Sequence, residues 1–449
     1  MDSWSSPVLV DDEIEKLAIR VHPPRVTIDN SSSATETLIK VDSANKLGSL
    51  LEVVQVLSDM DLVIKRAYIS SDGEWFMDVF HVVNRHGCKL AEEGIADRIQ
   101  HSLGPKGRSF RSLRQSVDFQ TTSESTAIEL TGKDRPGLLS EVFAVLTNLK
   151  CNVVAAEVWT HNSRMASVVY ITDVATKSPV HDDKRLAHIK QLLLFVLMGN
   201  GDKHTAKAAV SVGFSHKDRR LHQMMYADRD YDLQDDDSGQ VNDRCKPMVT
   251  AENCIDKAYT VVNLRCLDAP KLLFDAVFTL TDMQYVVHHA TVTVEGPEAN
   301  QEFYIRHVDG SPVSSEAERL RLIRCMEAAV KRRTAEGVRL ELCSEDRVGL
   351  LSEVTRIFRE NGLSVTQAKV MTRGSQAVNV FYVGDAFGSA VRTETIEAVR
   401  REIGSTVLNV KGDDFASAPQ EDEGFSLRRM FRSRSEKILW NLGLIRSCT

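Results

Sequence analysis

One eight-residue segment occurs twice in this chain with a single substitution. It reads Asp-Arg-Pro-Gly-Leu-Leu-Ser-Glu at residues 134–141 and Asp-Arg-Val-Gly-Leu-Leu-Ser-Glu at residues 346–353. Weaker copies begin at Asn45 and Asp268, and the copy at Asp268 has Lys271 where the other three have glycine. Because a repeated segment marks a repeated structural unit, the sequence predicts four copies of one fold.

The same pattern of apolar residues surrounds each copy. After it, apolar residues recur at helical spacing, as at Leu350, Val354 and Phe358. Before it comes a short apolar run with the alternation of a half-buried strand, at 38–41, 127–130, 259–262 and 338–342. Each unit is therefore expected to begin with a strand followed by a helix.

Two further β-rich runs and a second helix complete each unit. In the second unit the runs are 153–159 and 167–172, and the turn-forming pair Asn162-Ser163 between them predicts a hairpin. Apolar residues three or four apart then predict a closing helix, which in the first unit contains Ile95, Ile99 and Leu103. A last short strand is predicted only after the second unit, at 206–212, and the fourth, at 406–410.

The order β-α-β-β-α-β is that of the ferredoxin-like fold, an α+β fold in which helices cover one face of an antiparallel sheet. Each sheet leaves its other face uncovered, so we expect the four ferredoxin-like repeats to share faces in pairs, within the chain or between chains. The expected organisation is an N-terminal segment (1–34), four units (35–118, 125–212, 258–336 and 337–412), a linker with a short helix (213–257) and a tail (413–449).

The repeated junction resembles that of the ACT domain, a regulatory module that binds small molecules. The four-unit arrangement is similar to the plant ACT-domain-repeat (ACR) family, with Arg219-Arg220-Leu221-His222-Gln223-Met224-Met225 in the linker and Phe431-Arg432-Ser433-Arg434-Ser435-Glu436-Lys437 in the tail. The resemblance implies amino-acid binding and a regulatory rather than catalytic role. Similar modules end the bacterial glutamine-sensing uridylyltransferase, which implies nitrogen status as an input.

The candidate ligand-binding residues lie at the strand-to-helix junctions. Glycine at 48, 137 and 349 lets the backbone approach a ligand closely, because no Cβ intervenes. The first amides of the helix would receive an α-carboxylate, while Asn45, Asp134 and Asp346 would orient an α-ammonium or the loop itself. The alternative is structural, with the aspartate capping the helix and the glycine relieving backbone strain. The candidate set is Asn45, Gly48, Asp134, Arg135, Gly137, Asp346, Arg347 and Gly349.

Composition and motifs limit the other classes of function. The formal charge of −7, from 56 basic and 63 acidic residues, argues against a general nucleic-acid binder. The chain has no dinucleotide loop, phosphate loop, nucleophile elbow or His-Glu-x-x-His helix. The adjacent His288 and His289 lie in a β-rich run, where neighbouring side chains face opposite ways. We therefore expect no enzyme activity, no cofactor and no metal site.

Cysteine usage and the ends of the chain bear on its location. The eight cysteines include no Cys-x-x-Cys pair, which argues against a zinc ribbon or a disulfide scaffold and favours a reducing compartment. The acidic N-terminus lacks the layout of a targeting segment, and the longest apolar stretch, 192–198, is far shorter than a membrane-spanning helix. We expect a cytoplasmic protein, with the nucleus as a second location.

The tail combines basic and apolar residues. Residues 425–449 contain six Arg or Lys residues against Glu436, a local charge of +5. Such a segment docks on an anionic membrane, a nucleic acid or a partner groove, or packs back onto an uncovered sheet. We expect no direct nucleic-acid role, and contact with a membrane surface is the less favoured alternative.

Two functions remain open at this point. The first is a regulatory protein that binds a free amino acid and signals amino-acid or nitrogen status to a partner protein. The second is a ligand-independent scaffold for protein–protein interaction, a role that Lys271 in the third junction favours for that unit. A partner protein is expected in both cases, and self-association is a further expectation.

Overall fold

The structure of the chain is a computed structural model. It describes residues 25–45, 48–72, 75–90, 125–199, 206–210, 216–232, 246–254, 257–333, 337–404 and 407–411. The predicted closing helix of the first unit, with Ile95, Ile99 and Leu103, and the whole tail lie outside these described residues.

The first and third units form one sheet. The first contributes β1 (Arg25–Asp29), β2 (Thr37–Ala44), α2 (Ser49–Asp59), β3 (Val63–Ser71) and β4 (Trp75–Val83). The third contributes β9 (Met248–Cys254), β10 (Tyr259–Leu267), α7 (Leu272–Asp282), β11 (Tyr285–Glu295), β12 (Glu298–His307) and α8 (Glu316–Arg333). The eight antiparallel strands are ordered β1-β2-β4-β3-β11-β12-β10-β9.

The second and fourth units form the other sheet in the same way. The second contributes β5 (Thr126–Lys133), α4 (Leu138–Asn148), β6 (Cys151–His161), β7 (Arg164–Asp173), α5 (Asp183–Met198) and β8 (Lys207–Val210). The fourth contributes β13 (Val338–Glu345), α9 (Leu350–Glu360), β14 (Leu363–Arg373), β15 (Gln376–Asp385), α10 (Thr393–Ile403) and β16 (Leu408–Lys411). Their order is β16-β13-β15-β14-β6-β7-β5-β8.

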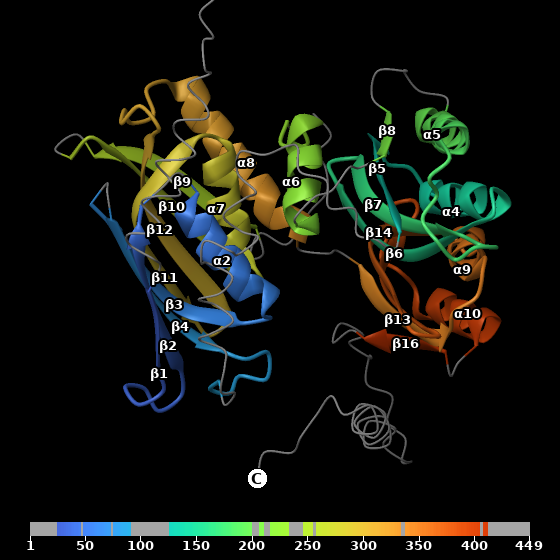
Figure 1. Cartoon of the computed structure of the whole chain (residues 1–449), viewed down its shortest axis with the longest axis horizontal. Coiled ribbons are helices and arrows are strands. Elements are labelled where there is room, and N and C mark those ends of the chain that lie inside the picture. The colour runs from blue at the N-terminus through green and yellow to red at the C-terminus, as the bar shows by residue number, and fades with distance from the viewer. Residues whose placement is uncertain are drawn as a thin grey trace, which may run out of the picture. The chain divides into compact units, whose positions relative to one another are not determined.

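The predicted fold class is confirmed, but the predicted face-sharing between units is wrong. The units pair edge to edge within the chain, through β3 with β11 and through β6 with β14. Helices of paired units lie side by side on one face of each sheet, α2 against α7 and α4 against α9 (Figure 1). Joining edges satisfies the backbone groups of two edge strands at once, which sharing faces would leave exposed.

The edge strands of the first and third units come from before the unit rather than after it. β1 pairs with β2, and β9 pairs with β10, at the sheet positions that β8 and β16 fill in the other two units. These units therefore begin earlier than residues 35 and 258, the predicted starts. Strands of five and seven residues are too short to give a clear alternating pattern in the sequence.

One further helix, α6 (Lys217–Ala227), lies in the predicted linker. Its Leu221, Met224 and Met225 pack with Trp159, Ala166 and Val168 of the second unit in a small apolar cluster separate from the two large cores. These strand residues face away from α4, because their neighbours Val158 and Val169 lie in the large core with that helix. α6 therefore covers part of the sheet face that we expected to be shared with another unit.

Among the described residues, the helices are too short or too polar for any of them to cross a membrane. The same residues include no group of three or more His, Cys, Asp or Glu side chains placed to hold a metal ion.

Candidate ligand site between the second and fourth units

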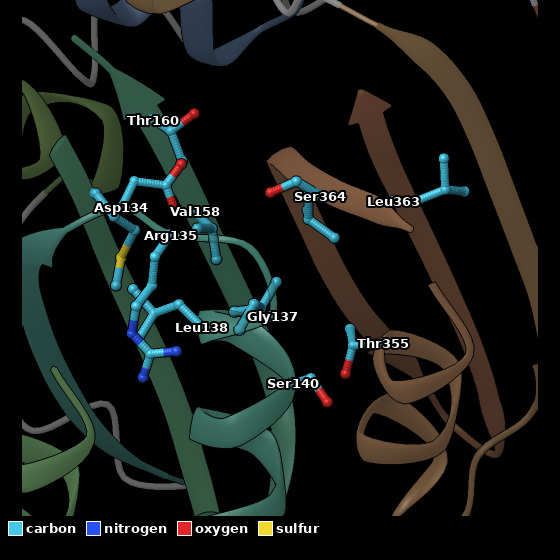
Figure 2. A pocket seen from close by; sticks show the side chains of 13 residues that line it. Asp134, Arg135, Gly137, Leu138, Ser140, Val158, Thr160, Thr355, Leu363 and Ser364 are labelled. Atoms are coloured by element: carbon cyan, nitrogen blue, oxygen red, sulfur yellow. The ribbon is translucent and has the colours of Figure 1, made fainter. Parts of the chain in front are cut away.

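Two small cavities lie where α4 and α9 meet, and each is lined by both units. We call them the Gly137 cavity and the Gly349 cavity, after the glycine at the junction that borders each. In the Gly137 cavity, Gly137, Ser140 and Val158 of the second unit lie opposite Thr355, Leu363 and Ser364 of the fourth (Figure 2). The Gly349 cavity is lined by Asp346, Arg347 and Gly349 of the fourth unit and by Phe143, Thr147 and Asn152 of the second, among others.

The two cavities are related by the internal duplication. Residues 212 positions apart are equivalent, and twelve of the thirteen residues that line the Gly137 cavity have their equivalent in the lining of the Gly349 cavity. Each cavity measures about 20 Å³, which is room for roughly one water molecule. A larger ligand would have to separate α4 from α9.

The junction glycines adopt a backbone conformation that L-residues avoid. Gly48, Gly137 and Gly349 have φ of 87°, 81° and 86°, and each is the N-cap residue of its helix without a side-chain capping bond. The predicted alternative of an aspartate cap is therefore wrong, because Asp134 and Asp346 lie three residues before the N-cap. Relief of backbone strain is a sufficient reason for glycine at this position.

The first turn of α4 has amides available to a ligand. The Leu138 amide donates to the Arg135 carbonyl at 3.1 Å, and the Glu141 amide donates to the Gly137 carbonyl at 3.2 Å. The amides of Leu139 and Ser140 have no hydrogen-bond partner among the described residues, and both residues line the Gly137 cavity. Unpaired amides at a helix N-terminus favour an anionic group.

Asp134 is a half-buried carboxyl that also lines the Gly137 cavity. Burial raises its pKa to about 6, although the backbone amide and the charge of Arg135 oppose this rise. Its own amide donates to the carbonyl of Ser163 in the hairpin turn at 2.8 Å, and the Asp346 amide donates in the same way to Ser375. Each aspartate therefore also connects the segment before the helix to the hairpin turn of its unit.

The two arginines of the motif point to partners in their own units. Arg135 forms two hydrogen bonds with the Glu141 carboxylate and a third with the carbonyl of Val196. Arg347 pairs with Glu353 in the equivalent position. Both arginines line the cavities, but these ion pairs give them a structural role.

The first junction differs from the other candidates. Gly48 has the same conformation as its equivalents, and Asn45 donates from Nδ2 to the Ser71 hydroxyl at 2.8 Å. Neither residue lines either of the two cavities. The structure thus brings six of the eight candidate residues to the contact between the second and fourth units and leaves Asn45 and Gly48 apart from it.

The third junction contacts α6. Lys271 adopts the left-handed conformation of the glycines, with φ of 65°, and its Nζ lies 2.8 Å from the Asp218 carboxylate of α6. Arg333 joins Asp218 to Asp275, and Asp275 pairs with the fully buried His222 at 2.8 Å. This network was missed in the sequence, where the only signal for it was a lysine in place of glycine.

Comparison with known proteins decides the family. Residues 32–109 match the ACR family N-terminal ACT domain, and residues 126–193 and 338–401 match the ACT domain. The ACT domain-containing protein ACR4 of Arabidopsis thaliana is 54% identical over 98% of both chains. The chain belongs to the ACR family of ACT-domain-containing plant proteins.

Two further relatives show how far the similarity extends. The ACT domain-containing protein ACR5 of Arabidopsis thaliana is 52% identical to this ACR protein, again over 98% of both chains. A bifunctional uridylyltransferase/uridylyl-removing enzyme of Azospirillum brasilense is 39% identical over 85 residues, which are 18% of this chain and 9% of the enzyme. This ACR protein is thus a regulatory protein built from ACT domains.

Proposed function

We propose that this ACR protein binds a free amino acid between its second and fourth units and signals amino-acid or nitrogen status to a partner protein without catalysis. The observation that carries the proposal is the cavity pair at the α4–α9 contact, where unpaired helix amides and a half-buried carboxyl from one unit lie across from polar side chains of the other. The sequence predicted ligand binding at the strand-to-helix junctions. The cavities lie at the junctions of the second and fourth units, where the two units contact each other.

The chemistry of the cavity matches the two charges of an amino acid. The free amides of Leu139 and Ser140 and the positive end of the α4 dipole would hold an α-carboxylate. Asp134, with a pKa of about 6, is mostly ionised at neutral pH and would accept hydrogen bonds from an α-ammonium. Both groups belong to the second unit, and Ser364 of the fourth unit lies across the cavity.

Binding at this place would change the relation between two units. Because each cavity holds about one water molecule as it stands, an amino acid would favour a state in which α4 and α9 are further apart. A ligand can shift this equilibrium only by its difference in affinity for the two states. The output would be altered contact with a partner protein.

The second candidate function is a scaffold that binds partner proteins without a small ligand. The small size of both cavities favours it, as does the third junction, whose Lys271 contacts Asp218 of α6. Under this reading the glycines and aspartates only shape the strand-to-helix junction.

A thermal-shift panel of the full chain against the twenty amino acids separates the two functions. A ligand at about a hundred times its Kd adds roughly 2.7 kcal/mol to the stability of the domain that binds it. We expect a saturable rise in Tm for a small subset of amino acids. An unchanged Tm for all twenty would exclude the sensor and leave the scaffold.

Two cavity-filling variants test whether the ligand that raises the Tm binds in these cavities. Each variant introduces the side chain found at the equivalent position of the other cavity. Thr355→Phe gives the Gly137 cavity the phenylalanine that the Gly349 cavity has at the equivalent position, Phe143. Ala377→Met gives the Gly349 cavity the methionine that the Gly137 cavity has at the equivalent position, Met165. Each new side chain already fits at the equivalent position, so we expect both variants to fold. The double variant should lose the ligand-induced rise in Tm.

A further inference from the structure

The same position in the strand after the hairpin turn carries a buried polar residue in all four units. These residues are Asp78, Ser167, Gln301 and Asn379, each at most 3% exposed. Each lies opposite the apolar residue seven positions before its junction residue, and these partners are Val41, Leu130, Leu264 and Leu342. Every one of the four has a side-chain nitrogen or oxygen without a hydrogen-bond partner among the described residues.

A buried polar group without a partner is unusual in a folded protein, and four at one repeated position suggest a shared reason. Polar groups are kept in a core when something else supplies the missing hydrogen bond. Asn379 is the one of the four that lines a cavity at the α4–α9 contact, where a ligand could do so, whereas Gln301 lines a separate hollow of about 400 Å³ on strands β9 to β12.

The orientation of the Asn379 amide is fixed by its neighbour. The Met371 backbone amide donates to Oδ1 of Asn379 at 3.3 Å, so the oxygen is the atom that faces the backbone of β14. Nδ2 is the atom left without a partner. Nδ2 carries two donor hydrogens and no acceptor, and Asn379 is one of the residues that line the Gly349 cavity.

The Gly349 cavity also has the more open junction of the two. A Cβ on Gly137 would lie 2.6 Å from Cδ of Arg359, because that side chain covers the glycine. The equivalent neighbour of Gly349 is the smaller Thr147, whose methyl group would lie 3.5 Å from such a Cβ. In the same cavity Ala377 stands where the Gly137 cavity has Met165, so the side chain at this lining position is smaller.

We infer that the Gly349 cavity is the site that selects the ligand, and that Nδ2 of Asn379 donates a hydrogen bond to the ligand's side chain. The ligand class is then an amino acid whose side chain ends in a carbonyl or carboxylate oxygen. This inference rests on the proposed function, since it assigns the ligand to one of the two equivalent cavities of that proposal. In the Gly349 cavity the first turn of α9 supplies the anion-binding amides, because those of Leu351 and Ser352 have no hydrogen-bond partner among the described residues.

The test measures binding of isosteric pairs to the full chain by calorimetry. Asparagine carries a carboxamide where leucine of the same shape has two methyl groups, and glutamine and methionine are similar in length. Aspartate and glutamate keep the acceptor oxygens without the amide NH2, so they separate the acceptor from the donor. We expect an acceptor-bearing member to bind at least tenfold more tightly than its apolar isostere. In Asn379→Leu this ratio should fall to about one, because the donor is lost while the side-chain volume is kept.

Gln301→Leu is the matched control, because Gln301 is the equivalent residue in the third unit and lines neither cavity at the α4–α9 contact. It should keep the full preference. Ala377→Met should abolish binding of the preferred amino acid, and Thr355→Phe should retain it. If Asn379→Leu does not fold, this second pair still tests the assignment of the cavity.

The outcomes separate this inference from the proposed function. Binding of an amino acid with the same preference in Asn379→Leu as in the natural chain overturns the inference and leaves the proposed function standing. Loss of binding in Thr355→Phe but not in Ala377→Met overturns the choice of cavity. Absence of binding by every amino acid overturns both.

Discussion

Lys271 and Asp218 form an ion pair that connects the third junction to α6. Nζ of Lys271 lies 2.8 Å from Oδ2 of Asp218, and the lysine occupies the position that glycine holds in the other three units. Burial alone would raise the pKa of Asp218, but Arg333 and Lys271 beside it hold that pKa well below its usual range. The left-handed conformation of Lys271 is therefore maintained by a contact that glycine could not make.

A double-mutant cycle with Lys271→Met and Asp218→Asn tests this pair. We expect a coupling of about 1 to 2 kcal/mol in the free energy of unfolding, because Asp218 is almost fully buried. The equivalent cycle on Arg347 and Glu353, both exposed, should give about 0.2 to 1 kcal/mol. Urea unfolding of the single and double variants measures both couplings, and equal values would show that Lys271 contributes no more than a surface pair.

The junction glycines predict a graded response to substitution. Gly349 has φ of 86°, where a β-branched residue is strongly disfavoured and Asn is tolerated. Gly349→Val should lower the free energy of unfolding by about 1 to 2 kcal/mol, and Gly349→Asn should lower it by less. Thermal unfolding of the two variants checks the order.

Because of this strain, Gly349→Val is a poor variant for testing ligand binding. Loss of ligand binding in Gly349→Val would follow from strain as well as from a blocked site, so Gly349→Asn is the better control. Equal stability of the two variants would contradict the requirement for a left-handed residue at the junction.

Asp78 predicts a pH dependence of stability with a defined sign. Burial raises its pKa to about 8, so the carboxyl is protonated in the folded chain at neutral pH and ionised in the unfolded chain. The stabilisation is therefore fully present below the unfolded pKa near 3.8 and is lost as pH rises through 8.

Asp78→Asn removes this dependence, and asparagine already occupies the equivalent position at 379. The free energy of unfolding of the variant relative to the natural chain should rise by at most about 1.4 kcal/mol per pH unit between pH 5 and 8. Urea unfolding at several pH values gives the slope. A constant difference across this range would mean that Asp78 stays ionised in the fold.

The small cluster under α6 predicts that this helix stabilises the second unit. Leu221 is fully buried against Trp159, which is also fully buried, and Arg333 stacks on the Trp159 ring at 4.9 Å. Leu221→Ala should cost about 2 to 5 kcal/mol and expose Trp159. Exposure of Trp159 should appear as a red shift of tryptophan emission from the folded protein. The double variant Trp159→Phe/Leu221→Ala is the control, because it should not show this shift. An unchanged spectrum in Leu221→Ala would contradict the packing of α6 on this unit.

The repeated helices and strands could be predicted because each unit contains short sequence patterns that specify them. The glycine before the helix, the periodic apolar residues as at Val354 and Phe358, and the Asn162-Ser163 turn each act over a few residues. Both residues of that turn have positive φ, as a tight hairpin requires. The pairing of units depends on which edges meet, and no local pattern encodes that choice.

The orientation of His288 and His289 is a second feature that could not be predicted from the sequence. They were expected to face opposite ways, yet both rings lie near Tyr259, with centroids 5.4 and 6.1 Å from it. A β-bulge between Val287 and His289 adds a residue to the strand and turns His288 toward the same side. The equivalent strand of every unit has a bulge at this place, which the sequence did not reveal.

The polar residues of the candidate site were only partly predictable. Asp134 and Gly349 belong to the repeated segment and were found through it. Asn379 lies outside that segment, and its meaning depends on the burial and the missing partner of one side-chain atom. Such information exists only once the strands are paired.

Calorimetric titration of the full chain with the amino acids that raise its Tm tests the central claim most directly. We predict saturable binding of one amino acid per chain, with an acceptor oxygen in its side chain, that disappears in Ala377→Met and persists in Thr355→Phe. Titrations without saturable heat for all twenty amino acids would contradict it and identify the chain as an interaction scaffold.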